Sequence, residues 1–460
     1  MAGEVLHRVE LQSAGVGKRR GGRWAVRMAT AAGLTAGLAA LCSCGNSYRP
    51  VEATIGLIGP AGQPVKYAVA ISSASPTANG LLTMVDFSGD TTLVTTALGV
   101  NPYYFVLNTN GTIGYTLNSD KTVNSVELSP ELISSQILET TLLPGANPQS
   151  LFATANASYM ADPGVNAIDQ LTGTPPALKQ ELPVASGYSP IYVVGQSSAA
   201  RAYAISPATN GGPGQVEAIE TSSNTISNTI TVGRGPVYGV MSLDTRRAFI
   251  LNQTDGTVSV INTSTNQLDT PLSTIPVGPQ PVWADLASGL DELVVANEGN
   301  GTSPGSVTII NVPLCVPTTL PTNPNCNAGN PIDATTFGQI VATVPVGINP
   351  IMVSVLGDYS RAYVANAGVL GLPCAPAAVA GVSTTCTISV VNLTSNTVTA
   401  TIPINGHPAY IATSNGTPTG KVYVVCKDSQ VMTVIETDTD TVDTTIPLQG
   451  FGISVRVTAP

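Results

Sequence analysis

A Gly-x-x-Pro turn recurs along this chain at nearly even spacing, and it constrains the fold more than any other feature of the sequence. The seven anchor prolines are Pro102, Pro148, Pro190, Pro236, Pro281, Pro350 and Pro408, the last in a contracted Gly406-His407-Pro408. Successive prolines lie 46, 42, 46, 45, 69 and 58 residues apart. A period in the mid-forties matches one four-stranded propeller blade, so the sequence predicts an all-β propeller.

Each repeat also contains four short apolar or alternating runs. In the unit after Pro236 these runs are 237–241, 247–252, 257–262 and 272–277. Turn residues such as Asp255-Gly256 separate them, as expected between neighbouring antiparallel strands. We therefore expect strands A, B, C and D in each blade, with A following the anchor proline.

The two chain ends together supply one further blade. Residues 66–71, 81–86 and 91–97 read as strands B, C and D without a strand A, whereas 452–457 reads as a strand A with nothing after it. Joining them would pair two edge strands that otherwise invite aggregation. The sequence thus favours a single ring of eight blades closed by its N- and C-terminal strands, with seven blades as the alternative.

Composition and charge agree with this fold class and exclude some partners. Hydrophobic residues make up 43% of the 460 residues and charged residues only 10%, which suits short strands with small polar turns rather than a disordered chain. The net charge of −10 becomes more negative once the basic N-terminus is set aside. An acidic surface repels phosphate backbones, so we expect no nucleic-acid partner.

The N-terminus has the pattern of a lipoprotein signal. A basic stretch that includes Lys18, Arg19 and Arg20 precedes an apolar run over 28–41, which is too short to span a bilayer. The run ends in a sequence resembling the bacterial lipobox, with Cys44 as the lipidated residue. We expect a signal peptide at 1–43, a lipid-anchored linker at 44–63 and the propeller at 64–460. An ordinary cleaved signal is the alternative.

The five remaining cysteines fall into two bracketing pairs and one single residue. Cys315 and Cys326 enclose one insertion and Cys374 and Cys386 another, and export to an oxidising compartment predicts two local disulfides. Metal binding is the rival reading, but neither pair has a nearby histidine or close zinc-type spacing. Cys426 follows an apolar run and is expected to be a buried free thiol.

The repeats resemble those of the YVTN β-propeller family, which includes YncE-like and surface-layer-type propeller lipoproteins. Tyr363-Val364-Ala365-Asn366 and Val294-Val295-Ala296-Asn297 come closest to the tetrapeptide that names it. The resemblance covers about residues 64–460 and is weakest in the unit after Pro148. It implies a seven- or eight-bladed propeller exported to the cell envelope.

The Gly-x-x-Pro turns connect strand D of one blade to strand A of the next, so they ring one mouth of the central channel. B→C loops open on the same face, including the insertion at 368–386, and loops on a rigid scaffold commonly bind ligands. The candidate ligand-binding residues at this mouth are Asn101, Tyr103, Asn147, Gln280, Trp283, Asn349, His407 and Tyr410. Turn-stabilising amides and blade-packing aromatics are the alternative interpretation.

Catalytic constellations are largely missing from the sequence. His7 and His407 are the two histidines, so we expect no histidine-based metal site or proton relay, and no catalytic residue is assigned. Propellers of similar appearance include lactonases with a calcium ion near the axis, but Asp285 is the one carboxylate we place there. Quinone-dependent propellers need an aromatic platform, and Trp283 is the one tryptophan after the signal. We therefore expect no cofactor.

These observations favour a non-enzymatic binding or scaffold lipoprotein, exported and anchored in the periplasm or at the cell surface. Its expected partner is a protein or glycan of the envelope, with membrane contact through the lipid alone. A lactonase-like or other hydrolase and a surface-layer or adhesion component are the two alternatives.

Overall fold

The computed structural model describes residues 66–128, 137–154, 157–270, 272–313, 336–375, 384–416 and 419–458. By its contacts the chain divides into two units, Met1–Gln63 and Pro64–Pro460, and all described residues belong to the second. Within the described residues every regular element is a β-strand. None of them forms a helix that could cross a lipid bilayer. The expected signal peptide, linker and Cys44 lie outside the described residues, as do Cys315 and Cys326.

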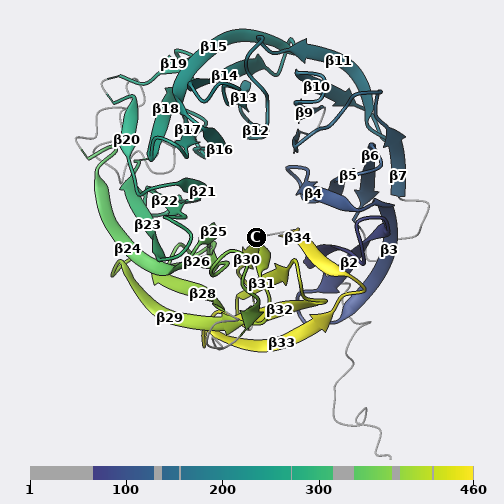
Figure 1. Cartoon of the computed structure of the whole chain (residues 1–460), viewed down its shortest axis with the longest axis vertical. Coiled ribbons are helices and arrows are strands. Elements are labelled where there is room, and N and C mark those ends of the chain that lie inside the picture. Colours follow the sequence, from purple (N-terminus) through teal and green to yellow (C-terminus); the bar gives the residue numbers. More distant parts are fainter. Residues whose placement is uncertain are drawn as a thin grey trace, which may run out of the picture. The chain divides into compact units, whose positions relative to one another are not determined.

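The strands form eight sheets, one for each blade and antiparallel apart from a short additional strand in blade 7, which confirms the eight-bladed ring (Figure 1). From the innermost strand A outwards, blades 1 to 4 are as follows: β34 Phe451–Val457, β1 Tyr67–Ser73, β2 Asn79–Asp86, β3 Thr92–Val100; β4 Pro102–Leu107, β5 Ile113–Asn118, β6 Thr122–Glu127, β7 Ile137–Thr141; β8 Ser150–Ala153, β9 Ser158–Asp162, β10 Ala167–Thr172, β11 Ala177–Pro183; β12 Tyr192–Val194, β13 Arg201–Ser206, β14 Pro213–Glu220, β15 Thr225–Arg234.

Blades 5 to 8 follow the same order, with a divided outer strand in blade 5 and one additional short strand in blade 7. They are β16 Pro236–Met241, β17 Arg247–Asn252, β18 Thr257–Asn262, β19 Gln267–Leu268 with β20 Thr274–Pro276; β21 Pro281–Ala287, β22 Glu292–Asn297, β23 Pro304–Asn311, β24 Ile340–Ile348; β25 Pro350–Val355, β26 Arg361–Asn366, β28 Thr384–Asn392, β29 Thr397–Ile404, with β27 Cys374–Ala375; β30 Pro408–Ser414, β31 Lys421–Cys426, β32 Val431–Glu436, β33 Thr441–Pro447.

Blade 1 is assembled from both ends of the chain, as the sequence predicts. The C-terminal strand β34 pairs antiparallel with β1, with Ala70 opposite Val455. In Figure 1 the yellow β34 accordingly lies beside the dark blue strands of the N-terminal end. This pairing gives β1 and β34 hydrogen-bonded neighbours in place of exposed edges.

The core consists of eight hydrophobic clusters, each joining two adjacent blades. Strands B and C are covered on both faces, and their sequences are accordingly continuous apolar runs, such as the fully buried β31. Outer strands face solvent on one side, so their more exposed and less exposed residues alternate, as in β15. The cluster that contains Val85 and Tyr423 joins blade 8 to blade 1, so the packing also closes the ring.

Close packing between a glycine and an asparagine explains why the glycine of the Gly-x-x-Pro turn recurs. Asn297 ends strand B of blade 6, and its amide donates to Thr308 Oγ1 at 2.9 Å and Ser306 Oγ at 3.2 Å. A Cβ on Gly278 would lie only 2.7 Å from the Asn297 side chain. Gly99, Gly233 and Gly347 meet the strand-B asparagine of the following blade in the same way.

The glycines of the Gly-x-x-Pro turns serve two different purposes. Gly99, Gly233, Gly278 and Gly347 do not have positive φ angles and are required because an asparagine approaches closely. Gly145 and Gly187, with φ of 95° and 91°, instead adopt a backbone conformation that favours glycine.

We predict that Gly278→Ala lowers the free energy of unfolding by about 1–3 kcal/mol, because the added methyl group overpacks the Asn297 site. Gly89→Ala is the matched control: its Cβ would come no closer than 3.5 Å to another side chain, so we expect a change within about 0.5 kcal/mol. Equilibrium urea unfolding measures both. Equal effects of the two substitutions would contradict this account of the motif.

Candidate functional site

An aromatic layer crosses the space inside the ring of innermost strands. It is built from the second residue after the anchor proline in six of the eight blades: Tyr104, Tyr192, Tyr238, Trp283, Met352 and Tyr410. The ring centroids of Tyr238 and Trp283 are 4.0 Å apart and stacked, and Tyr192 lies 4.8 Å from Tyr238. Tyr410 meets Trp283 edge-on at 5.8 Å. These are the offset and edge-to-face arrangements that aromatic pairs favour.

A β-bulge at the start of strand A places these side chains. In five blades the register with strand B shifts between the proline and the second residue after it, as between Pro236 and Tyr238. The bulge leaves one residue unpaired and re-aims its neighbours. As a result Val237 and Tyr238 both line the channel, although adjacent residues of a regular strand would face opposite sides.

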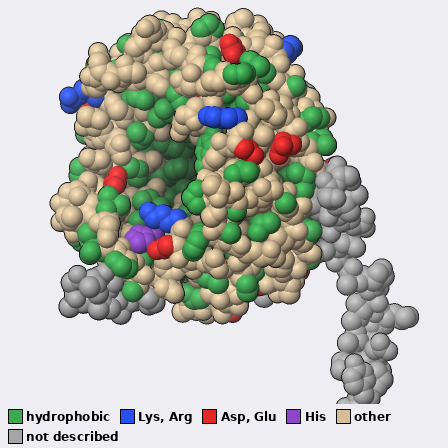
Figure 2. Space-filling view, turned by 45° about the vertical axis from the view of Figure 1, so that its right-hand side comes forward, with side chains coloured by type: hydrophobic (Ala, Val, Ile, Leu, Met, Phe, Trp, Pro, Cys, Tyr) green, Lys and Arg blue, Asp and Glu red, His purple; other side chains and the backbone are tan. Residues whose placement is uncertain are grey.

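Two cavities lie on either side of this layer. One, of about 390 Å³, is lined by the first residues of the inner strands, on the side of the D→A turns. The other, of about 430 Å³, is lined by the later residues of strands β21, β25 and β30, towards the opposite face. Tyr238, Trp283, Met352, Tyr410 and Arg456 line both cavities. Figure 2 shows the hollow with apolar walls and only scattered charged side chains around it.

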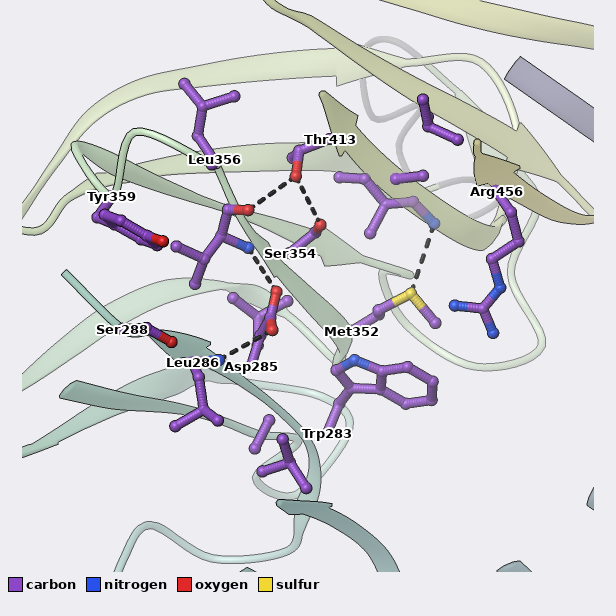
Figure 3. A pocket seen from close by; sticks show the side chains of 18 of the residues that line it. Trp283, Asp285, Leu286, Ser288, Met352, Ser354, Leu356, Tyr359, Thr413 and Arg456 are labelled. Carbon is purple, nitrogen blue, oxygen red and sulfur yellow. Dashed lines mark hydrogen bonds between the residues drawn. The ribbon is translucent and has the colours of Figure 1, made fainter. Parts of the chain in front are cut away.

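Arg456 is the one lysine or arginine that lines either cavity. It comes from β34, and its guanidinium lies 4.2 Å from the Tyr410 ring centroid. Its Nε and one terminal nitrogen donate to Phe105 O at 3.3 Å. Within the described part of the chain no carboxylate lies within ion-pairing distance of it. Figure 3 shows Arg456 and Trp283 directed into the same space.

The tyrosines around Arg456 are neutral hydrogen-bonding groups. Burial raises the pKa of Tyr410 to about 12, although the positive charge of Arg456 opposes the shift. Burial likewise raises the pKa of Tyr104. The Tyr410 hydroxyl is enclosed and has no hydrogen-bond partner among the described residues, which leaves a free donor beside the guanidinium.

Asp285 and Arg456 are the two charged residues of the eight innermost strands. The Asp285 carboxylate accepts hydrogen bonds from Leu286 N and from Val355 N of the next blade, both at 2.8 Å (Figure 3). Burial raises the pKa of Asp285 to about 6 despite these bonds and the charge of Arg456. Asp285 therefore links blades 6 and 7 and is anchored by backbone rather than by a metal-type cluster of side chains.

The structure brings together some of the residues predicted at the mouth and separates others. Tyr103, Trp283 and Tyr410 line the cavity on the D→A side. Tyr103 also donates from its hydroxyl to Pro148 O at 2.6 Å. The remaining five residues line neither cavity: Asn101, Asn147, Gln280, Asn349 and His407.

Local geometry accounts for the four amide residues of this set. Asn101, Gln280 and Asn349 have φ angles of 44°, 57° and 56°, the left-handed conformation that such turns require. Asn147 N donates to Asp162 Oδ1 at 2.8 Å. No ligand contact is needed to explain these positions, and their role in ligand binding stays a prediction.

The insertion in blade 7 contains the expected disulfide between Cys374 and Cys386, with Cα atoms 5.6 Å apart. Cys426 is a buried free thiol, as predicted. The expectation that neither cysteine pair has a histidine nearby was wrong in space, because a ligand atom of His407 lies within 4.8 Å of both sulfurs. The chain separates His407 from Cys386 by a whole strand, which conceals this proximity in the sequence.

Sequence reasoning missed Tyr192, Tyr238 and Arg456. A signal for the first two was available, since they occupy the same place after an anchor proline as Trp283 and Tyr410. Arg456 is harder to recognise because β34 follows no Gly-x-x-Pro turn. Its signal is that a charged residue interrupts an otherwise apolar inner strand.

We predict opposite pH dependences for two aspartate substitutions. Because the pKa of Asp285 is raised in the folded protein, its contribution to stability is lost as the pH rises from about 4 through about 6. Asp285→Asn removes this loss, so between pH 4 and pH 7 the variant gains roughly 1–3 kcal/mol in free energy of unfolding relative to the wild type.

Asp255 is the matched control, because the backbone N–H of Arg234 lowers its pKa most strongly. Its stabilising contribution is present above its unfolded pKa and is lost as the pH falls. Asp255→Asn should therefore lose stability relative to the wild type as the pH rises. Urea unfolding at a series of pH values measures both variants, and a pH-independent difference for Asp285→Asn would refute the assignment.

Comparison with known proteins identifies the fold. No protein-family model matches the chain, and no curated protein sequence matches it. Among solved structures, the dihydro-heme d1 dehydrogenase NirN in complex with DHE aligns with a TM-score of 0.62 at 10% identity, over 88% of this chain and 78% of its own. Apo AztD from Citrobacter koseri aligns with a TM-score of 0.56 at 11% identity, over 85% of this chain and 97% of its own. At such identities the likeness supports a shared propeller architecture.

Proposed function

We propose that this protein is a non-enzymatic binding module of the cell envelope that holds a small anionic ring compound in the channel of its propeller. The observation that carries the proposal is Arg456, a cation in an aromatic channel with no carboxylate partner among the described residues. The anion of the ligand would supply the missing partner.

The environment of Arg456 makes an anion favourable. A guanidinium removed from water is costly unless it is paired and hydrogen-bonded. Phe105 O accepts from two of its nitrogens, so the other side of the planar fork can donate to a carboxylate or phosphate. The unpartnered Tyr410 hydroxyl lies beside it and can donate to the same anion.

The aromatic layer favours a ring as the rest of the ligand. Trp283, Tyr238 and Tyr410 present stacked and edge-on faces to both cavities. Either an aromatic ring or the apolar face of a sugar can pack on such a surface. The shared chemistry is a ring that bears an acidic group, and an acidic sugar would fit the glycan partner expected from the sequence.

Access would be from the D→A face, where the candidate residues of the mouth lie. Asn101 and Gln280 would then contact only the part of a larger ligand that extends out of the channel, whereas Asn349 is buried. The insertion at 368–386, which the sequence predicts to open on this face, is proposed to discriminate between ligands.

The proposed location rests on the sequence. The lipobox-like segment supports attachment through Cys44, and the acidic surface makes nucleic acid an unsuitable partner. The strand-B asparagines and their Ser/Thr partners support membership of the YVTN-repeat propellers. NirN, whose structure contains a similar fold, was solved in complex with DHE, and this supports ligand binding here by analogy of fold alone.

Trp283 fluorescence offers a direct test, because the other tryptophan, Trp24, lies in the expected signal peptide. We expect an aromatic carboxylate such as phenylacetate, or an acidic sugar such as trigalacturonate, to shift this fluorescence saturably. Arg456→Gln should weaken binding of the anion about 30-fold or more, with little effect on an uncharged amide or neutral-sugar analogue.

Arg234→Gln is the control for this experiment, since Arg234 is a cation of a D→A turn that lines neither cavity, and its side chain is 54% exposed and pairs with Asp255. A response to phenylacetate alone would indicate an aromatic acid as the ligand, and a response to trigalacturonate alone would indicate an acidic sugar. Equal affinity of wild type and Arg456→Gln for the anions, or the absence of any response at millimolar concentration, would contradict the proposal. Turnover of a lactone by the purified protein would favour the hydrolase alternative.

Attachment through Cys44 has its own test. We expect Cys44→Ser to abolish incorporation of a palmitate analogue and to release the protein from the membrane fraction, whereas Cys42→Ser retains both. Metabolic labelling with fractionation of the cells measures this outcome. Membrane attachment that persists in Cys44→Ser would rule out the proposed anchor.

A further inference from the structure

The geometry at the junction of blades 7 and 8 points to a second, redox-gated site: we propose that Cys374, Cys386 and His407 bind a zinc ion when the disulfide between the two cysteines is reduced. This inference is independent of the channel and of the function proposed for it. It uses three side chains whose ligand atoms all lie within 4.8 Å of one another.

The three residues have the chemistry that zinc prefers. Two thiolates and one imidazole form a Cys₂His ligand set, which leaves a fourth, open position for water. Cys386 is buried, whereas Cys374 and His407 are partly exposed. A metal can therefore reach the site from the D→A face, where the His407 turn and the blade 7 insertion meet.

Asp428 holds His407 in a geometry suited to a metal ligand. Asp428 Oδ2 lies 2.6 Å from His407 Nδ1, and Oδ1 accepts a hydrogen bond from His407 N at 2.6 Å. This leaves Nε2 as the ring nitrogen available to a metal. In zinc sites a carboxylate commonly accepts a hydrogen bond from the non-ligating nitrogen of the histidine and so fixes the orientation of the ring.

The backbone keeps the two sulfurs close without the disulfide. The short strand β27 pairs in parallel with β28, with Cys374 opposite Thr384, two residues before Cys386. Thr384 N also donates to Pro373 O at 2.9 Å. In the reduced state the Cys386 thiol can donate to Ala367 O, which lies 3.1 Å from its sulfur, until a metal displaces that proton.

The switching step conserves atoms and charge. A dithiol reductant attacks one sulfur of the Cys374–Cys386 bond, forms a mixed disulfide and closes its own disulfide. Two electrons and two protons are thereby transferred to the protein as two thiols. Zn²⁺ then binds with release of both thiol protons. A disulfide oxidant takes up two electrons from the two thiolates, leaves as two thiolates of its own and re-forms the Cys374–Cys386 bond, so that both ligands are lost and the ion is released.

The test uses the full-length chain with Cys42, Cys44, Cys315 and Cys326 replaced by serine, so that Cys374, Cys386 and Cys426 remain. After reduction with a phosphine, we expect one Zn²⁺ per chain by elemental analysis and thiolate-to-metal charge-transfer absorption with Co²⁺. The oxidised protein should bind neither. Cys426→Ser is the matched control and should bind as the parent does, because Cys426 is buried outside the ligand set.

Substitutions separate the ligands from their support. Cys374→Ser and His407→Ala should each weaken zinc binding at least tenfold and alter the Co²⁺ spectrum. Asp428→Asn should weaken zinc binding about 10–100-fold and retain the charge-transfer bands. Because Cys374 and His407 are both partly exposed, we expect their replacement to leave the fold intact. Unchanged Trp283 emission would confirm this for each variant. Stoichiometric zinc on the oxidised protein, no zinc on the reduced protein, or binding unaffected by His407→Ala would overturn the proposal.

Discussion

The pairing of β34 with β1 is the interaction on which the rest of the structure depends. It completes blade 1, and the adjoining cluster with Val85 and Tyr423 completes the packing between blades 8 and 1. The same strand brings Arg456 to the channel. Ring closure and the charge of the candidate site therefore depend on one segment at the end of the chain, and damage to it would affect both.

The bulges at the start of the inner strands link the repeat to the site. If strand A were a regular strand that served only for packing, alternate residues would face the channel, and no two consecutive residues would do so. The register shift after the anchor proline turns two consecutive residues inwards, which allows a small ring of blades to carry an aromatic layer. Trp283 and Tyr238 thus result from the same local geometry that each repeat inherits, whereas Arg456 distinguishes blade 1.

The fold could be predicted from the sequence because each element of the repeat is fixed by short-range physics. The anchor prolines mark strand A, the buried runs such as Val422–Val425 mark strand B, and the polar turns separate the strands. Eight blades followed from the incomplete units at the two chain ends. The packing role of the turn glycines could not be predicted from the sequence, because the close approach of Asn297 to Gly278 depends on three-dimensional packing.

The site was only partly predictable for the same reason. Trp283, Tyr103 and Tyr410 were identified from their positions at the mouth, but the amide residues beside the prolines prove to fulfil turn geometry, as the φ of Asn349 shows. The meeting of His407 with Cys374 and Cys386 depends on loops from two blades. Sequence spacing carries no information about such a contact unless the blade order is already known.

A crystal structure of the protein with the tightest-binding acidic ring compound would show whether the channel holds an anion on Arg456. We expect the acidic group within hydrogen-bonding distance of the Arg456 guanidinium and the Tyr410 hydroxyl, with the ring packed against Trp283. A ligand bound on the outer loops, with Arg456 still contacting only Phe105 O, would contradict this placement of the anion.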